Sequence, residues 1–270
     1  MLQPNNVINK KRIRNKLVSL QVICLVSLGL LVHTQVVAVE LDSRLVWHRK
    51  AVLSTPVSGV IIGINVKPGA LVKKGDVLLR LDDRLLKANV DQAKANVERW
   101  DRLQQEAKRE LDRTLELYER TLLSDHEREM AYINHAQARA DFKSAQAAQV
   151  QSELDLEYSA VRAPFDGIVI RQYAEVGETI VSTQAARPLV ELAEYGYMAV
   201  NILVSDNRYK QLKLGAFANV MVGGASYQGT ITAVGLEPVS ASAQEYEINI
   251  VFSTKGKLMR AGQSAKVSLP

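Results

Sequence analysis

The sequence of 270 residues predicts an α+β fold. We expect a β-sandwich built from two halves, a long antiparallel coiled-coil α-hairpin inserted between them, and a small antiparallel β-barrel near the end. Two observations predict this order. No glycine or proline occurs from Asp76 to Ala163, although the chain holds 15 Gly and 7 Pro, and such a stretch is typical of uninterrupted helix. The segments on either side of it repeat one motif.

The composition is that of a globular protein, with 47% hydrophobic, 23% charged and 6% aromatic residues. The basic excess, 34 Lys+Arg against 29 Asp+Glu, lies at the N-terminus, because five bases precede the first acid, Glu40. The remainder carries no formal excess of positive charge. We therefore expect no nucleic-acid partner.

Residues 1–38 have the order of a secretory signal. Bases between Lys10 and Lys16 precede an uncharged apolar run from Leu17 to Val32, and Val36-Val37-Ala38 offers a small residue for cleavage. The alternative is an inner-membrane anchor, since apolar character resumes through Val39. Both readings place the rest of the chain outside the cytoplasm. Cys24, the only cysteine, lies in this segment, so the exported part forms no disulfide.

Residues 39–50 are expected to supply a first strand to the barrel, and 51–82 and 158–192 to form the halves of the sandwich. Three pairs of residues in the two halves share a spacing of 108, namely Pro56 with Pro164, Gly59 with Gly167, and Gly69 with Gly177. The apolar set Val60, Ile62, Ile64 and Val66 predicts a half-buried strand. We expect the glycines to occupy turns with positive φ, and the two halves to share one core.

Residues 83–157 are predicted to form the hairpin, because apolar and small residues recur at alternating steps of four and three. In the first helix this seam comprises Leu86, Val90, Ala93, Val97, Trp100, Gln104, Ala107, Leu111, Thr114, Tyr118 and Thr121. In the second it comprises His135, Ala138, Phe142, Ala145, Gln149, Ser152 and Leu156. Ser124 and Glu127 form a capping-box pattern, which predicts a very short turn. Arms of roughly 37 residues would project about 55 Å.

Residues 193–270 read as short alternating strands separated by turn residues, the pattern of a small antiparallel barrel. Few contacts are expected where the hairpin meets the sandwich and where the sandwich meets the barrel. Gly196 is the candidate backbone hinge of the second joint. The alternative is that Gly196 simply ends a strand.

The arrangement resembles the periplasmic adaptor, or membrane fusion protein, family of tripartite efflux and secretion systems (HlyD-like and RND-type members). The resemblance is carried by Ser58-Gly59-Val60, by the run from Val72 to Leu79, by the run from Arg162 to Gly167, and by the hairpin and barrel. It implies a split lipoyl-like sandwich and a periplasmic, inner-membrane-associated adaptor. The implied partners are an inner-membrane transporter of RND or ABC type, an outer-membrane channel, and further copies in a ring.

The resemblance also implies a partner-binding site at the hairpin tip. Arg120, Leu123 and Ser124 are similar to a compressed form of the Arg, Leu and Ser pattern across the turn of channel-binding adaptors. Leu122 and Glu127 complete the candidate site. The residues alone allow simpler roles, since Ser124 and Glu127 can serve as a helix cap and Arg120 as a solvated base. Leu122 and Leu123 cannot both face one seam, so one of them is expected to be free for a partner.

No enzymatic activity, cofactor or metal is expected. His126 and His135 lie nine residues apart without a third ligand nearby, and the methionines are scattered. An alternative function is a lipoyl- or biotinyl-type carrier linked to an enzyme complex, because such domains carry a prosthetic group on a lysine at a tight turn. Here the helical insertion replaces that turn, and Asp82-Asp83-Arg84 has no lysine at its centre.

Overall fold

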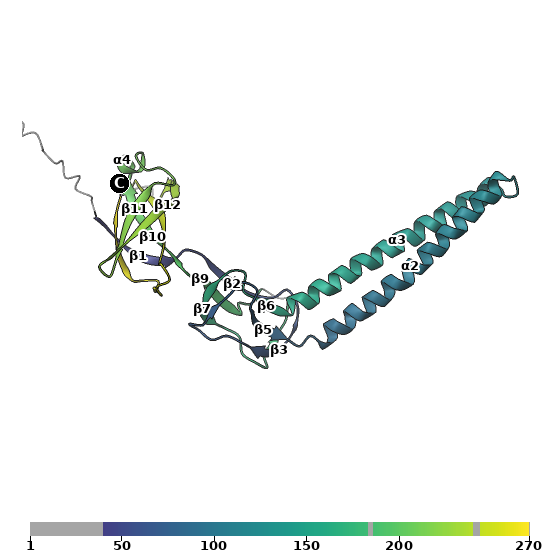
Figure 1. The fold of residues 1–270 in the computed structure, drawn as a ribbon, viewed down its shortest axis with the longest axis horizontal. Helices are drawn as coiled ribbons and strands as arrows, with labels where there is room; N and C mark the ends of the chain where they lie inside the picture. The colour runs from purple at the N-terminus through teal and green to yellow at the C-terminus, as the bar shows by residue number, and fades with distance from the viewer. Residues whose placement is uncertain (1–39, 183–185, 240–243, 270) are drawn as a thin grey trace, which may run out of the picture.

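The computed structural model describes residues 40–182, 186–239 and 244–269. Figure 1 shows a β-barrel, a β-sandwich and a helical hairpin following one another along an extended molecule. The predicted export segment and Cys24 lie outside the described residues. Within the described residues, no helix has the length and apolar character needed to cross a membrane.

The sandwich consists of two four-stranded sheets, in the orders β2-β9-β7-β4 and β6-β5-β3-β8. Its strands are β2 (Lys50–Leu53), β3 (Gly59–Ile64), β4 (Leu71–Val72), β5 (Val77–Leu81), β6 (Ala160–Arg162), β7 (Gly167–Gln172), β8 (Thr179–Ile180) and β9 (Val190–Glu194). The repeat is visible in these bounds, because β3 and β7, like β4 and β8, are offset by 108 residues at both ends. The two halves interlock, since β4 pairs with β7 and β8 pairs with β3. The shared core contains Leu78, Leu79, Leu81, Val169, Leu189 and Leu192.

The predicted alternation in β3 is wrong at its first positions. Ile61 is fully buried, whereas Val60 and Ile62 are 41% and 55% exposed. The register with β5 shifts between Ile61 and Gly63, so a bulge inverts the phase of the strand. Beyond the bulge the residues predicted to face the core do so, and Val66 is buried.

The expectation of positive φ holds for Gly69 and Gly177, at 89° and 91°. It is wrong for Gly59 and Gly167, which begin β3 and β7 without positive φ. At Gly167 the constraint is a close approach between neighbouring backbones. A Cβ there would lie 2.5 Å from the carbonyl oxygen of Ala193, so only glycine fits.

The barrel is closed, in the order β1-β10-β13-β12-β11-β14. Its strands are β1 (Glu40–Trp47), β10 (Tyr197–Ser205), β11 (Phe217–Val222), β12 (Ala225–Pro238), β13 (Glu245–Ser253) and β14 (Ser264–Ser268), with the short helix α4 (Asp206–Tyr209) after β10. Its core includes Leu45, Met198, Val200, Ile231, Ile248, Ile250 and Val267. The chain crosses from barrel to sandwich after β1 and returns between β9 and β10, so two segments join these units.

Replacing Gly167 by alanine is expected to destabilise the fold by about 1–3 kcal/mol, because the added methyl group must displace the backbone of β9. Thermal or denaturant unfolding measures the change. Gly63→Ala is the matched control, since a Cβ at Gly63 meets nothing within 4 Å and its φ is not positive. Equal stability of the two variants would contradict the close-approach explanation.

Candidate partner-binding site on the helical hairpin

The hairpin consists of α2 (Arg84–Glu119) and α3 (Asp125–Tyr158), which lie side by side along their length (Figure 1). The bounds correspond to arms of about 54 and 51 Å at 1.5 Å per residue. The seam residues expected from the sequence are buried or half-buried, with the exception of Thr121. Thr121 lies in the turn with φ 59° instead. The seam surfaces of α2 and α3 are thus covered by packing against each other.

The base of the hairpin is held by hydrogen bonds, which contradicts the expectation of few contacts at this joint. The Leu81 amide donates to the Ser159 carbonyl at 2.8 Å, and the Thr55 hydroxyl donates to the Tyr158 carbonyl at 2.8 Å. At the start of α2, hydrogen bonds from Arg84 hold the pKa of Asp82 at about 2. The acidic group that precedes α2 is therefore part of a local ion pair.

The turn at the tip is fixed by the capping box that the sequence predicts. The Ser124 hydroxyl accepts from the Glu127 amide, and the Glu127 carboxylate accepts from the Ser124 amide at 2.8 Å. This backbone hydrogen bond lowers the pKa of Glu127. Ser124 and Glu127 therefore have a structural role that is complete within the chain.

A second cluster closes the tip one turn below. The Tyr118 hydroxyl donates to Asp125 Oδ1 at 2.7 Å, and this bond raises the pKa of Tyr118. Arg128 lies over the Tyr118 ring at 4.4 Å and pairs with Asp125 at 3.1 Å. The cluster joins the end of α2 to the start of α3, so the tip has a defined shape.

The predicted tip residues differ in what they expose. Leu122 is 67% exposed, whereas Leu123 is half-buried and lines a groove with Met130 and Leu117. Arg120 pairs with Glu116 at 2.5 Å on the surface of α2. The structure therefore presents one leucine at the apex beside a paired guanidinium, while the other closes the turn.

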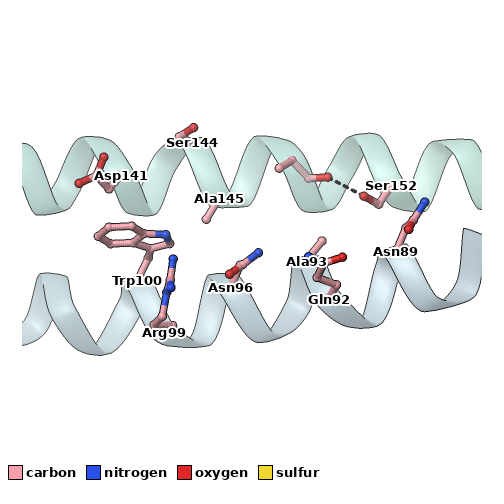
Figure 2. A pocket seen from close by; sticks show the side chains of 11 residues that line it. Asn89, Gln92, Ala93, Asn96, Arg99, Trp100, Asp141, Ser144, Ala145 and Ser152 are labelled. Carbon is pink, nitrogen blue, oxygen red and sulfur yellow. Dashed lines mark hydrogen bonds between the residues drawn. The ribbon is translucent and has the colours of Figure 1, made fainter.

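One broad face of the hairpin carries two grooves between the helices. The groove near the tip, of about 710 Å³, is mainly apolar and is lined by Leu103, Ala107, Leu111, Leu123, Met130 and Ala131 among others. The groove nearer the base, of about 430 Å³, is shown in Figure 2. There Asn96 and Trp100 of α2 point toward Ala145 of α3, whose short side chain leaves the space open, and Ser144 lies on the outer edge of α3.

The outward face of α3 was not predicted from the sequence. In an isolated pair of helices the position farthest from the partner is normally polar. In α3 this position is occupied by His126 in the first turn and then by the apolar residues Ile133, Ala140, Ala147 and Leu154, all exposed and spaced by seven. The corresponding column of α2 continues from Ala88 and Ala95 to Arg102, Arg109 and Glu116. The seven-residue spacing in α3 is the signal that could have identified this face.

Gly196 lies between β9 and β10 with φ 91°, and a Cβ there would meet nothing within 4 Å. Its carbonyl accepts from the Thr254 amide at 2.9 Å, while the Tyr195 hydroxyl donates to the Gly256 carbonyl at 2.8 Å. The joint between sandwich and barrel is therefore crossed by two chain segments and these hydrogen bonds.

The described residues contain no cluster of three metal-ligating side chains.

A split sandwich that carries a helical arm on one side and a barrel on the other is the architecture of an adaptor-type protein. Comparison with known proteins agrees with this class. Residues 49–190 match the model of the CzcB-like, barrel-sandwich hybrid domain, and the chain belongs to this family of membrane fusion proteins, or periplasmic adaptors. Adaptors of efflux systems are non-enzymatic linkers, which separates this chain from the carrier alternative.

Two curated relatives are similar over most of the chain. Nodulation protein NolF of Rhizobium meliloti (strain 1021) is 26% identical over 218 residues, covering 79% of this chain and 58% of that protein. Efflux pump periplasmic linker BepD of Brucella suis biovar 1 (strain 1330) is 24% identical over 180 residues, covering 67% of this chain and 45% of that protein. The chain thus matches about half the length of these relatives.

Among solved structures, the membrane fusion protein Spr0693 from Streptococcus pneumoniae R6 has the same fold. The TM-score is 0.63 at 16% sequence identity, and the match covers 86% of this chain and 98% of that one. At this identity the similarity concerns the fold alone.

The capping box predicts a pH dependence at the tip. Because the folded-state pKa of Glu127 is lowered, its stabilising effect is full above the ordinary value of 4.5 and is lost as the pH falls through the folded value. We expect amide protection in the first turn of α3 to decrease below about pH 4.5 in the wild type. In Glu127→Gln the protection should be lower and nearly constant. Hydrogen exchange measures both profiles, and coinciding profiles would show that the carboxylate does not hold the cap.

Proposed function

We propose that this chain is the periplasmic adaptor subunit of a tripartite efflux or secretion pump. In this role it bridges an inner-membrane transporter and an outer-membrane channel and thereby supports export across both membranes. The observation that carries the proposal is the long arm whose helices satisfy each other and whose apex exposes Leu122 at 67%. Family membership supports the adaptor class, and the bridging role rests on the shape and surfaces of this chain.

The hairpin tip docks on the periplasmic end of the channel. Leu122 supplies an apolar contact, Arg120 a charge beside it, and the apolar groove under Leu123 a place for a partner side chain. The capping box of Ser124 and Glu127 and the cluster around Tyr118 hold these groups in a fixed arrangement before binding. A preformed site loses little conformational entropy on binding.

The other end of the molecule serves the inner membrane. The barrel faces the transporter, of RND or ABC type, together with the adjoining segment 45–52. The structure divides this segment between β1 and β2. Gly196 acts as the hinge between sandwich and barrel, because its positive φ and open surroundings leave its backbone without side-chain constraints. Rotation at Gly196 would strain the two hydrogen bonds that cross the joint. It would also change the angle between sandwich and barrel, so that the chain can contact both partners at once.

Changing the tip is expected to abolish transport without unfolding the protein. In a variant with Leu122→Glu, Leu123→Ser and Arg120→Glu, the apolar contact and the charge are both replaced, while the capping box remains. Accumulation of the exported compound in a host strain that depends on this chain should rise to the level of the deletion strain. Leu85→Glu, at a 71% exposed leucine near the base of α2, is the matched control. Undiminished transport by the tip variant would remove the tip from the mechanism.

A second copy of the chain covers the outward face of α3. Exposed apolar residues at a heptad spacing are suited to packing against a helical partner, and alanine at Ala140 and Ala147 allows it to approach closely. The grooved face of the hairpin, lined by Ala145 and Ala131, is a different surface that can receive this ridge. Contact between two different surfaces is heterologous, and such contacts generate a ring when the rotation between successive copies closes.

Introducing charge on this face should weaken self-association. In Ala140→Glu with Ala147→Glu, both glutamates point away from α2, so the monomer keeps its helices while the ridge becomes charged. We expect the association constant, measured by sedimentation velocity, to fall by about tenfold or more. The matched control is Ala88→Glu with Ala95→Glu, which places the same charges on the outward face of α2. Equal effects of the two pairs would contradict a specific role of α3.

A further inference from the structure

The end of the barrel farthest from the sandwich has a surface that the adaptor role does not explain. β10 enters the barrel at Tyr197, next to the sandwich, and leaves it at Ser205, which pairs with Glu245 at the start of β13. The end of β12 lies at the same place, because the Val239 amide donates to the Glu245 carbonyl at 2.8 Å. Figure 1 shows α4 at this far end.

Four large apolar side chains are exposed around this end. Leu214 is 67% exposed, Phe217 63%, Leu236 89% and Val239 58%. Leu214 and Phe217 precede and begin β11, whose first pair is Phe217 with Thr230. β12 continues past that pair to Pro238, so β12 and β13 form a ribbon that extends beyond β11 and carries Leu236 near its end. We call these four residues the end patch.

The start of the described chain lies close to the end patch. Glu40 pairs with Ser268, which also pairs with Asn219, two residues after Phe217. The sequence before Glu40 contains the uncharged apolar run from Leu17 to Val32. If that run is held in a membrane, the eight residue steps from Val32 to Glu40 allow a separation of at most about 29 Å. The end patch therefore lies at the end of the barrel where the described chain begins.

The charges around the end patch nearly cancel. Arg208, Lys210 and Lys213 lie near Asp206, Glu237 and Glu245, and Lys210 pairs with Asp206 at 2.5 Å. At the same end of the barrel, Tyr209 of α4 and Tyr246 of β13 stack at 4.2 Å between ring centroids. Apolar side chains near tyrosines, with balanced charge, are suited to the boundary between lipid headgroups and acyl chains.

We propose that the end patch inserts into the surface of a lipid bilayer, so that the barrel rests on the membrane through Leu214, Phe217, Leu236 and Val239. The contact goes beyond the proposed adaptor function, because it needs neither the transporter nor the channel. It fixes the axis of the barrel relative to the membrane and leaves the sides of the barrel for protein partners. Since the charges balance, apolar insertion dominates the binding.

The test places a fluorophore in the end patch of the full chain. Leu236→Cys, in a Cys24→Ser background, is labelled and mixed with vesicles of phosphatidylethanolamine and phosphatidylglycerol that carry brominated acyl chains. We expect the bromines to quench the label about twofold or more, with little change when the salt is raised to about 0.5 M. The control label is at Val176→Cys, a 62% exposed valine of the sandwich, and should not be quenched.

Several outcomes would overturn the proposal. The first is an unquenched label at position 236, and the second is equal quenching at positions 236 and 176. The third is a label at position 236 that is shielded from solvent only in native membranes that contain the transporter, which would assign the patch to a protein partner. A variant with Leu214→Ser, Phe217→Ser and Val239→Ser should reduce quenching at position 236 about tenfold, even where the N-terminal segment keeps the chain on the vesicle. None of these results depends on the hairpin tip, so a failure here is distinguishable from a failure of the adaptor function.

Discussion

The pairing of β5 with β6 is the constraint on which the rest of the molecule depends. These two short strands hold the beginning and the end of the hairpin side by side, with Leu79 opposite Val161 and the Leu81 amide bonded to Ser159. A helical insertion that starts and ends at neighbouring strands must go out and return over similar lengths, and α2 and α3 have 36 and 34 residues. Because Leu78, Leu79 and Leu81 are buried in the sandwich core, the arm is anchored in the part of the fold that is hardest to open.

Features that depend on neighbours in sequence could be predicted well. The seam of the hairpin follows from a 3.5-residue period, and the start of α3 follows from Ser124 and Glu127, because both arise within a few residues. The repeat at a spacing of 108 residues predicted that the two halves correspond, and the observed strands β3 and β7, like β4 and β8, have matching bounds. The presence of a barrel followed from alternation and turn spacing alone.

Features that depend on distant backbone could not be predicted in this way. The bulge at Ile61 and Gly63 arises from pairing with β5 and decides which side of β3 is buried. Gly167 is required by the carbonyl of Ala193 in another strand, and no local signal distinguishes it from a turn glycine. The interlocking of the halves is likewise a property of β3 with β8 and of β4 with β7. The apolar column of α3 lies opposite the predicted seam and could have been read from the sequence, whereas the grooves between α2 and α3 appear only in the structure.

Photo-crosslinking in cells tests whether the tip of the rigid arm contacts an outer-membrane partner. A photoreactive amino acid is placed at Leu122, at the apex, and in a separate variant at Ile62, which is also exposed but lies on the sandwich. The account predicts that position 122 yields an adduct with an outer-membrane protein and that position 62 does not. Adducts from position 122 that contain only inner-membrane proteins, or the same outer-membrane adduct from both positions, would contradict it.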